Sequence, residues 1–152
     1  MKNQTIKTQL LKHCTASLET RLQSVLAVIN DIKQSLQSET KSSAGDKHET
    51  GRAMLQLERE KARHQLAEIE KTKQILSKIN PESTSKNIGL GSVVFTTKSN
   101  YFISISAGEI KVNNDAFYAI SASTPIGQLL LGKTSGDKVT FRNLTFEILT
   151  VV

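Results

Sequence analysis

The sequence predicts an α+β protein in which an N-terminal coiled-coil hairpin of two antiparallel helices precedes a compact antiparallel β-sheet domain with one short helix. Three observations lead to this fold class. Apolar residues recur every seven positions in the first half of the chain, as they do in coiled coils. In the second half they alternate every two positions, as in strands. Between the halves lies a short polar segment that begins with Pro81. We therefore expect the hairpin over residues 1–80, a linker over 81–87 and the sheet domain over 88–152.

The first helix is predicted by two interleaved series of apolar residues. The spacing of seven, with an offset of four between the series, is that of the a and d positions of a heptad repeat. No Gly or Pro interrupts the chain between Gln4 and Glu39. The residues are Leu11, Leu18, Val25 and Ile32 in one series and Leu22, Ile29 and Leu36 in the other.

A second helix is predicted from about Glu49 to Ile79, after a turn of small residues from Ser42 to Asp46. A short connection between two long helices favours an antiparallel hairpin. A homodimer through the same seam is the alternative arrangement. The apolar stripe of this helix is thinner than that of the first and consists of Leu55, Ala62, Leu66, Ile69 and Leu76.

The last 65 residues predict about five strands and one short helix. Thr124 followed by Pro125 is typical of a helix N-cap and first turn, and Gly132 marks the end of that helix. The predicted strands are the β-branched and aromatic runs 93–95, 101–106, 117–120, 139–141 and 144–151.

Charge and composition restrict the function classes. Residues 1–80 hold 14 of the 20 basic residues and 9 of the 14 acidic ones, a surplus that suits an anionic partner such as nucleic acid; a solvated helix surface is the alternative. The single Cys14 excludes an internal disulfide, and we expect it near a helix seam. No apolar run reaches the roughly 18 residues that cross a bilayer. With no signal-peptide pattern at the N-terminus, we expect a cytoplasmic protein without membrane contact.

Two motifs that suggest chemistry are rejected. Gly127, Gly132, Lys133 and Thr134 satisfy the spacing of a phosphate-binding loop. The residues between the two glycines, however, look like a turn of buried helix, and too little chain follows to complete a nucleotide-binding domain. The three histidines, His13, His48 and His64, do not have the spacing of metal ligands.

The tip of the predicted hairpin carries two carboxylates, Asp46 and Glu49. Their spacing of three fits a capping box at the start of the second helix. Alternatively, they help to coordinate a divalent cation together with another macromolecule, because two carboxylates are too few to hold Mg²⁺ tightly. From the residues alone, both interpretations stay open.

The chain resembles the bacterial Gre transcript-cleavage factors over nearly its whole length. Residues 120–137, I-S-A-S-T-P-I-G-Q-L-L-L-G-K-T-S-G-D, are similar to that family's C-terminal signature of S-P-[IL], a short helix, G-K and G-D. Residues 45–50, G-D-K-H-E-T, resemble the family's tip sequence G-D-x-x-E-N.

This resemblance implies an FKBP-like sheet domain and a role as an accessory factor that has no enzymatic activity of its own. In the family, the sheet domain docks on RNA polymerase and the coiled coil enters the secondary channel. The tip carboxylates there assist a Mg²⁺ that is shared with the polymerase active site during hydrolysis of backtracked RNA. By position, the resemblance assigns the Mg²⁺-assisting role to Asp46 and Glu49 and polymerase docking to Thr124, Pro125 and Ile126. Charge, more than motif, suggests contacts to the nascent RNA 3′ segment for Lys41, Lys47, Arg52 and Arg59. No cofactor is expected on the chain alone, and we expect a monomer.

The resemblance weakens just after the tip. The family continues with Asn and then commonly Ala-Glu-Tyr, whereas this chain has Thr50, Gly51, Arg52 and Ala53. A secondary-channel regulator that binds polymerase without stimulating cleavage is therefore one alternative function. A coiled-coil dimer or adaptor that mediates protein interactions is another.

Overall fold

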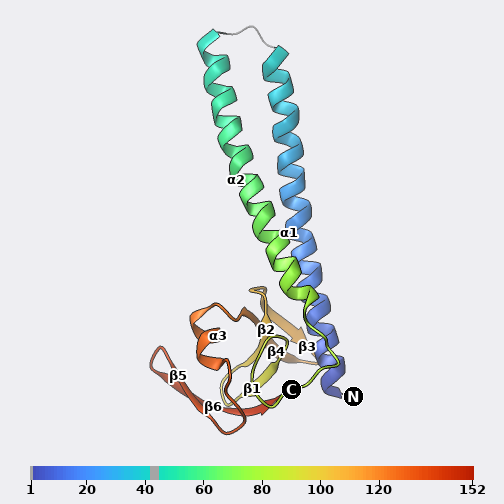
Figure 1. Cartoon of the computed structure of the whole chain (residues 1–152), viewed down its shortest axis with the longest axis vertical. Helices are drawn as coiled ribbons and strands as arrows, with labels where there is room; N and C mark the ends of the chain where they lie inside the picture. Colours follow the sequence, from blue (N-terminus) through green and yellow to red (C-terminus); the bar gives the residue numbers. More distant parts are fainter. Residues whose placement is uncertain (1, 42–44) are drawn as a thin grey trace. The chain divides into compact units, whose positions relative to one another are not determined.

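The computed structural model describes residues 2–41 and 45–152, and the side chains of 5–38 and 50–152. Helix α1 spans Lys2–Lys41 and helix α2 spans Gly45–Ser77 (Figure 1). The chain forms two compact units. The hairpin unit is Leu18–Thr72, and the sheet unit combines Met1–Ser17 with Lys73–Val152. The predicted fold class, two long helices followed by a sheet with a short helix, is confirmed. The domain boundaries at 80/81 and 87/88 stay a prediction.

In the hairpin unit, α1 and α2 run antiparallel and pack through the predicted heptad positions (Figure 1). Ile32, Leu36 and Ala62 are buried at their contact, and Ile29 and Leu55 pack against them. Burial of these apolar side chains is the main force that holds two long amphipathic helices together. The seam is thus occupied within the single chain.

The start of α2 differs from the prediction. The helix begins at Gly45, about one turn before the expected start near Glu49. Asp46 therefore lies inside the first turn and not at the flanking position that an N-cap occupies. The rest of the predicted turn, residues 42–44, lies outside the described residues.

The sheet unit contains six strands in the order β3-β4-β2-β1-β6-β5. All neighbouring strands are antiparallel except β2 and β4, which are parallel. The expectation of an antiparallel sheet is therefore wrong at this pair. Strand β3 lies at the edge of the sheet and forms a hairpin with β4, and β4 runs beside β2 in the same direction. The strands are β1 (Val93–Thr96), β2 (Asn100–Ser104), β3 (Gly108–Val112), β4 (Asp115–Ser121), β5 (Lys138–Phe141) and β6 (Leu144–Val151).

Strand β3 was absent from the prediction, and its hairpin turn explains why it forms. Asn113 and Asn114, between β3 and β4, both have positive φ, 53° and 69°. Two consecutive positive-φ residues are the mark of a two-residue hairpin turn, and Asn tolerates this conformation better than most residues. Arg142 and Asn143 make the same kind of turn between β5 and β6.

Both faces of the sheet are covered. On one face, Val94, Ile103 and Ile148 form a core with Leu130 from the short helix. On the other face, Phe102 and Phe117 are completely buried. Because side chains alternate between faces along a strand, β2 contributes to both cores.

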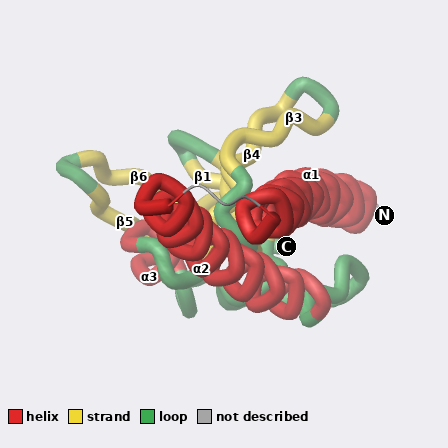
Figure 2. Tube along the Cα trace, turned by 90° about the horizontal axis from the view of Figure 1, so that it is seen from above, coloured by secondary structure: helices red, strands yellow, loops and turns green. Residues whose placement is uncertain are grey.

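The N-terminal part of α1 belongs to the sheet unit and buries Ile6, Leu10 and Cys14. The Cys14 Sγ lies 3.6 Å from the Oγ of Ser104 on β2. Cys14 therefore packs against the sheet and not at the seam between the two long helices, where we expected it. Figure 2, a view from above, shows α1 as one continuous helix.

The short helix α3 spans Pro125–Leu130 and starts as predicted. The Thr124 Oγ1 accepts a hydrogen bond of 3.1 Å from the backbone N–H of Gly127. Gly132 ends the segment with a φ of 82°. Gly127 and Leu130 are buried helical residues, so the rejection of a phosphate-binding loop is confirmed.

We predict that Gly127→Ala lowers the free energy of unfolding by about 1–3 kcal/mol. A Cβ at this position would overlap the carbonyl oxygen of Ser121 and lie 2.9 Å from the Thr124 Oγ1. The matched control is Gly89→Ala, because a Cβ at Gly89 has no atom within 4 Å. Urea denaturation of the two variants measures the difference, and equal stability would contradict the close packing of α3.

Candidate functional site

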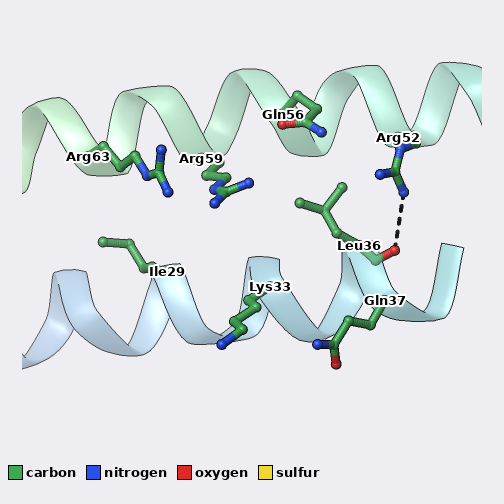
Figure 3. A pocket seen from close by; sticks show the side chains of 8 residues that line it. All are labelled: Ile29, Lys33, Leu36, Gln37, Arg52, Gln56, Arg59 and Arg63. Atoms are coloured by element: carbon green, nitrogen blue, oxygen red, sulfur yellow. Dashed lines mark hydrogen bonds between the residues drawn. The ribbon is translucent and has the colours of Figure 1, made fainter. Parts of the chain in front are cut away.

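A groove of about 390 Å³ lies along the hairpin unit, between α1 and α2 (Figure 3). Four side chains from each helix line it, and those of Arg59 and Arg63 extend from α2 toward α1. The lining residues are Ile29, Lys33, Leu36 and Gln37 from α1 and Arg52, Gln56, Arg59 and Arg63 from α2.

The groove exists because arginines occupy seam positions of α2. Arg52, Arg59 and Leu66 are spaced by seven residues, so they share one heptad position beside the one held by Leu55 and Ala62. Arg52 and Arg59 are half-buried. An arginine at such a position can pack its methylene groups against the seam and direct its guanidinium outward. The seam is therefore less filled at these turns than one made of leucines.

Arg52 is anchored across the hairpin. Its Nη1 donates a hydrogen bond of 3.4 Å to the backbone carbonyl oxygen of Leu36 (Figure 3). Leu36 lies more than one turn before the end of α1, so this hydrogen bond adds a second donor to a carbonyl that already lies within the helix. The hydrogen bond therefore ties the side chain of Arg52 on α2 to the backbone of α1.

The electrostatics of the groove favour an anionic ligand. Four of its eight lining residues are cationic and none is acidic. Among the residues whose side chains are described, Lys33, Arg59 and Arg63 have no ion-pair partner. Cations that are close together and uncompensated attract phosphate or carboxylate groups, and the planar guanidinium can bind either in a bidentate manner.

This basic groove is a local feature. The hairpin unit as a whole has nine basic and nine acidic residues, whereas the sheet unit has eleven basic and five acidic ones. The surplus of five basic residues within residues 1–80 therefore comes from residues 1–17 and 73–80, which belong to the sheet unit. Acidic residues such as Glu58 and Glu60 are exposed and do not line the groove.

The predicted Mg²⁺-assisting residues lie in the first turn of α2. Positions 46 and 49 are three residues apart in a helix, and so they share one face of it. The side chains of Asp46, Glu49, Lys41 and Lys47 lie outside those described. Among the described side chains, no group of three or more His, Cys, Asp or Glu residues is arranged to hold a metal ion.

The predicted docking residues lie at the start of α3, and two of them have structural roles. Thr124 caps the helix, and Ile126 packs against the core of the sheet unit. Pro125 is exposed. Sequence reasoning missed two exposed leucines on the same short segment, Leu129 and Leu131, which are 40% and 41% exposed. Leu129 follows Pro125 by four residues, a spacing that places two side chains on one face of a helix.

Sequence reasoning also missed Lys33 and Arg63 in the groove. Arg63 follows Arg59 by four residues, which places the two side chains on one face of α2. Lys33 follows the seam residue Ile32 and reaches the groove from α1.

None of the described helices has a segment long and apolar enough to cross a membrane.

No family model matches the chain, and no curated protein matches it. The chain is similar to a solved structure described as "Structure of the transcription factor Gfh1". The two chains are 21% identical over 88% of this chain and 90% of that one, with a TM-score of 0.34. The fold described above rests on the helices and strands of the chain itself.

We predict that Arg59→Leu raises the free energy of unfolding by about 0.5–2 kcal/mol. The substitution places an apolar side chain at a half-buried seam position between Leu55 and Ala62. The control is Arg63→Leu, which removes the same charge from an exposed position and should change stability by no more than about 0.5 kcal/mol. Thermal unfolding followed by circular dichroism measures both; a destabilised Arg59→Leu would contradict the seam assignment.

Proposed function

We propose that this protein is an accessory transcription elongation factor that binds RNA polymerase and stimulates cleavage of backtracked RNA. The observation that carries the proposal is the antiparallel hairpin whose far end holds Gly45, Asp46 and Glu49 in the first turn of α2. The hairpin unit contains 28 residues of α2, which span roughly 40 Å at about 1.5 Å per residue. A rod of this length suits delivery of a few side chains into a narrow channel.

The two tip carboxylates suit a metal ion that is shared with the polymerase better than one that this chain binds alone. Asp46 and Glu49 supply at most four oxygen atoms, and Mg²⁺ requires six ligands in octahedral geometry. They would therefore complete a site whose other ligands belong to the polymerase and the RNA. A bound Mg²⁺ supplies stabilisation of the charge that develops during phosphodiester hydrolysis. The role of this chain is to bring and orient the carboxylates.

The basic groove supplies cations that suit contact with the RNA. Lys33, Arg59 and Arg63 are cations without an ion-pair partner among the described side chains. A single-stranded RNA segment carries one negative charge per nucleotide, which such a row of cations can neutralise.

The exposed Pro125, Leu129 and Leu131 on and beside α3 offer an apolar surface for docking on a protein partner.

We predict that Asp46→Asn or Glu49→Gln lowers RNA cleavage in stalled elongation complexes at least tenfold, because each removes one carboxylate charge from the shared metal site. The measurement is release of the RNA 3′ fragment from backtracked complexes of the polymerase from the same organism. Binding to polymerase should persist, since neither change affects the seam or the sheet unit. Matched controls are Glu58→Gln and Glu60→Gln, which remove an exposed carboxylate elsewhere on α2. Full cleavage by both tip variants would refute the carboxylate mechanism.

A second function is favoured by the anchoring of Arg52. The related family commonly has an acidic residue at this position, whereas here a guanidinium is hydrogen-bonded to the carbonyl of Leu36. A cation at position 52 replaces a negative charge with a positive one three residues after Glu49, and this opposes the binding of a metal cation at the tip. This arrangement supports a factor that occupies the secondary channel and regulates polymerase without cleavage.

The two functions differ in the behaviour of the unmodified protein. A non-cleaving regulator will leave backtracked RNA intact at saturating protein and will compete with a cleavage-stimulating factor for the same polymerase. Under this second hypothesis, Arg52→Glu restores a family-like acid and is expected to raise cleavage from the background rate. Efficient cleavage by the unmodified protein excludes the regulator.

A further inference from the structure

A second pocket, of about 110 Å³, lies entirely within the sheet unit. Lys7 of α1 and Lys78, just after α2, contribute to it. The rest of its wall comes from residues 80–92, which include the polar segment that the sequence suggested was only a linker. Its volume is roughly that of three to four water molecules in the liquid, which is the size range of a small oxyanion.

Lys7 is the unusual residue of this pocket. It is only 3% exposed, and its Nζ donates a hydrogen bond of 2.6 Å to the backbone carbonyl of Ser83. Within the part of the chain that the structure describes, no carboxylate contacts it. A buried ammonium without a counter-charge is costly, and burial lowers the pKa of Lys7 accordingly. An anion beside the Nζ would remove this penalty.

The other polar groups of the pocket have hydrogen atoms to donate. The Asn80 Oδ1 accepts from the N–H of Glu82, which leaves its Nδ2 as a donor. The hydroxyl oxygens of Ser85 and Ser92 each accept one backbone N–H. A hydroxyl that accepts through a lone pair keeps its own proton for another acceptor. With two lysines, several hydroxyls and no carboxylate among its lining residues, the pocket is rich in donors.

The charge of the chain around the pocket also favours an anionic ligand. Residues 1–17 and 73–92, which supply the pocket, contain six lysines and one acidic residue, Glu82. Charges of one sign around a partly closed pocket raise the local concentration of counter-ions. This surplus belongs to the sheet unit and is separate from the groove. The hairpin unit as a whole has equal numbers of basic and acidic residues.

We propose that this pocket binds a phosphate group, with Lys7 as its buried ligand and Lys78, Asn80 and the serine hydroxyls as further donors. The ligand is either free inorganic phosphate or the phosphate monoester of a small molecule. The proposal does not depend on the function proposed above, since it uses no residue of the tip, the groove or α3.

The test is an NMR titration of the full chain with inorganic phosphate, with ionic strength held constant by chloride. We expect saturable one-to-one shifts of the backbone amides of residues 80–92. Lys7→Met, which keeps a similar chain length without the charge, should weaken binding at least tenfold, and Lys78→Met several-fold. Lys12→Met removes an equal charge from an exposed position on the same helix and should leave the affinity unchanged.

A parallel titration with AMP distinguishes the two sources of phosphate. Equal or tighter binding of AMP at the same amides identifies a phosphate monoester, and binding of inorganic phosphate alone identifies the free ion. Circular dichroism checks each variant, and Lys78→Met decides the outcome if Lys7→Met does not fold. The proposal is wrong if neither ligand gives saturable shifts, or if Lys12→Met weakens binding as much as the pocket variants do.

Discussion

The structure depends on one uninterrupted helix, α1, that must satisfy two different packing partners. Its buried residues Ile6, Leu10 and Cys14 are spaced by four, and each such step advances about 40° beyond a full turn. From Leu18 onward, the spacing alternates between three and four, which averages 3.5 and keeps the apolar stripe along a partner helix. The change of spacing divides a single helix between the sheet unit and the hairpin unit. No Gly or Pro in its sequence allows it to be divided by a break instead.

Much of this fold could be predicted from the sequence because its strongest signals are local. The heptad series fixes the seam, and Thr124 with Pro125 fixes the start of α3. Strand β3 was harder to recognise because only Ile110 and Val112 mark its buried face, although Asn113 and Asn114 are a hairpin signal. The parallel pairing of β2 with β4 depends on which distant strands meet, and no local pattern encodes that choice.

The residues of the candidate sites were harder to predict from the sequence. The place of Arg52 and Arg59 in the seam follows from their spacing of seven, but their charge drew attention to the surface instead. Lys7 gave no signal at all, because its burial depends on how residues 80–92 fold over it. A lysine beside Ile6 in an amphipathic helix is ordinarily solvated. The roles of Asp46 and Glu49 rest on the resemblance and remain a prediction.

The division of charge between the units has a kinetic consequence. At physiological salt, the Debye length is about 8 Å, so a balanced surface exerts little force on a distant polyanion. The hairpin unit, with equal numbers of acids and bases, therefore contributes mainly once contact is made, and its cations act on the dissociation rate. For the anionic partner proposed above, the sheet unit, with eleven bases against five acids, would govern diffusional encounter. Added salt should thus slow association with an anionic partner through the sheet unit, while the residence time reflects close contacts in the hairpin.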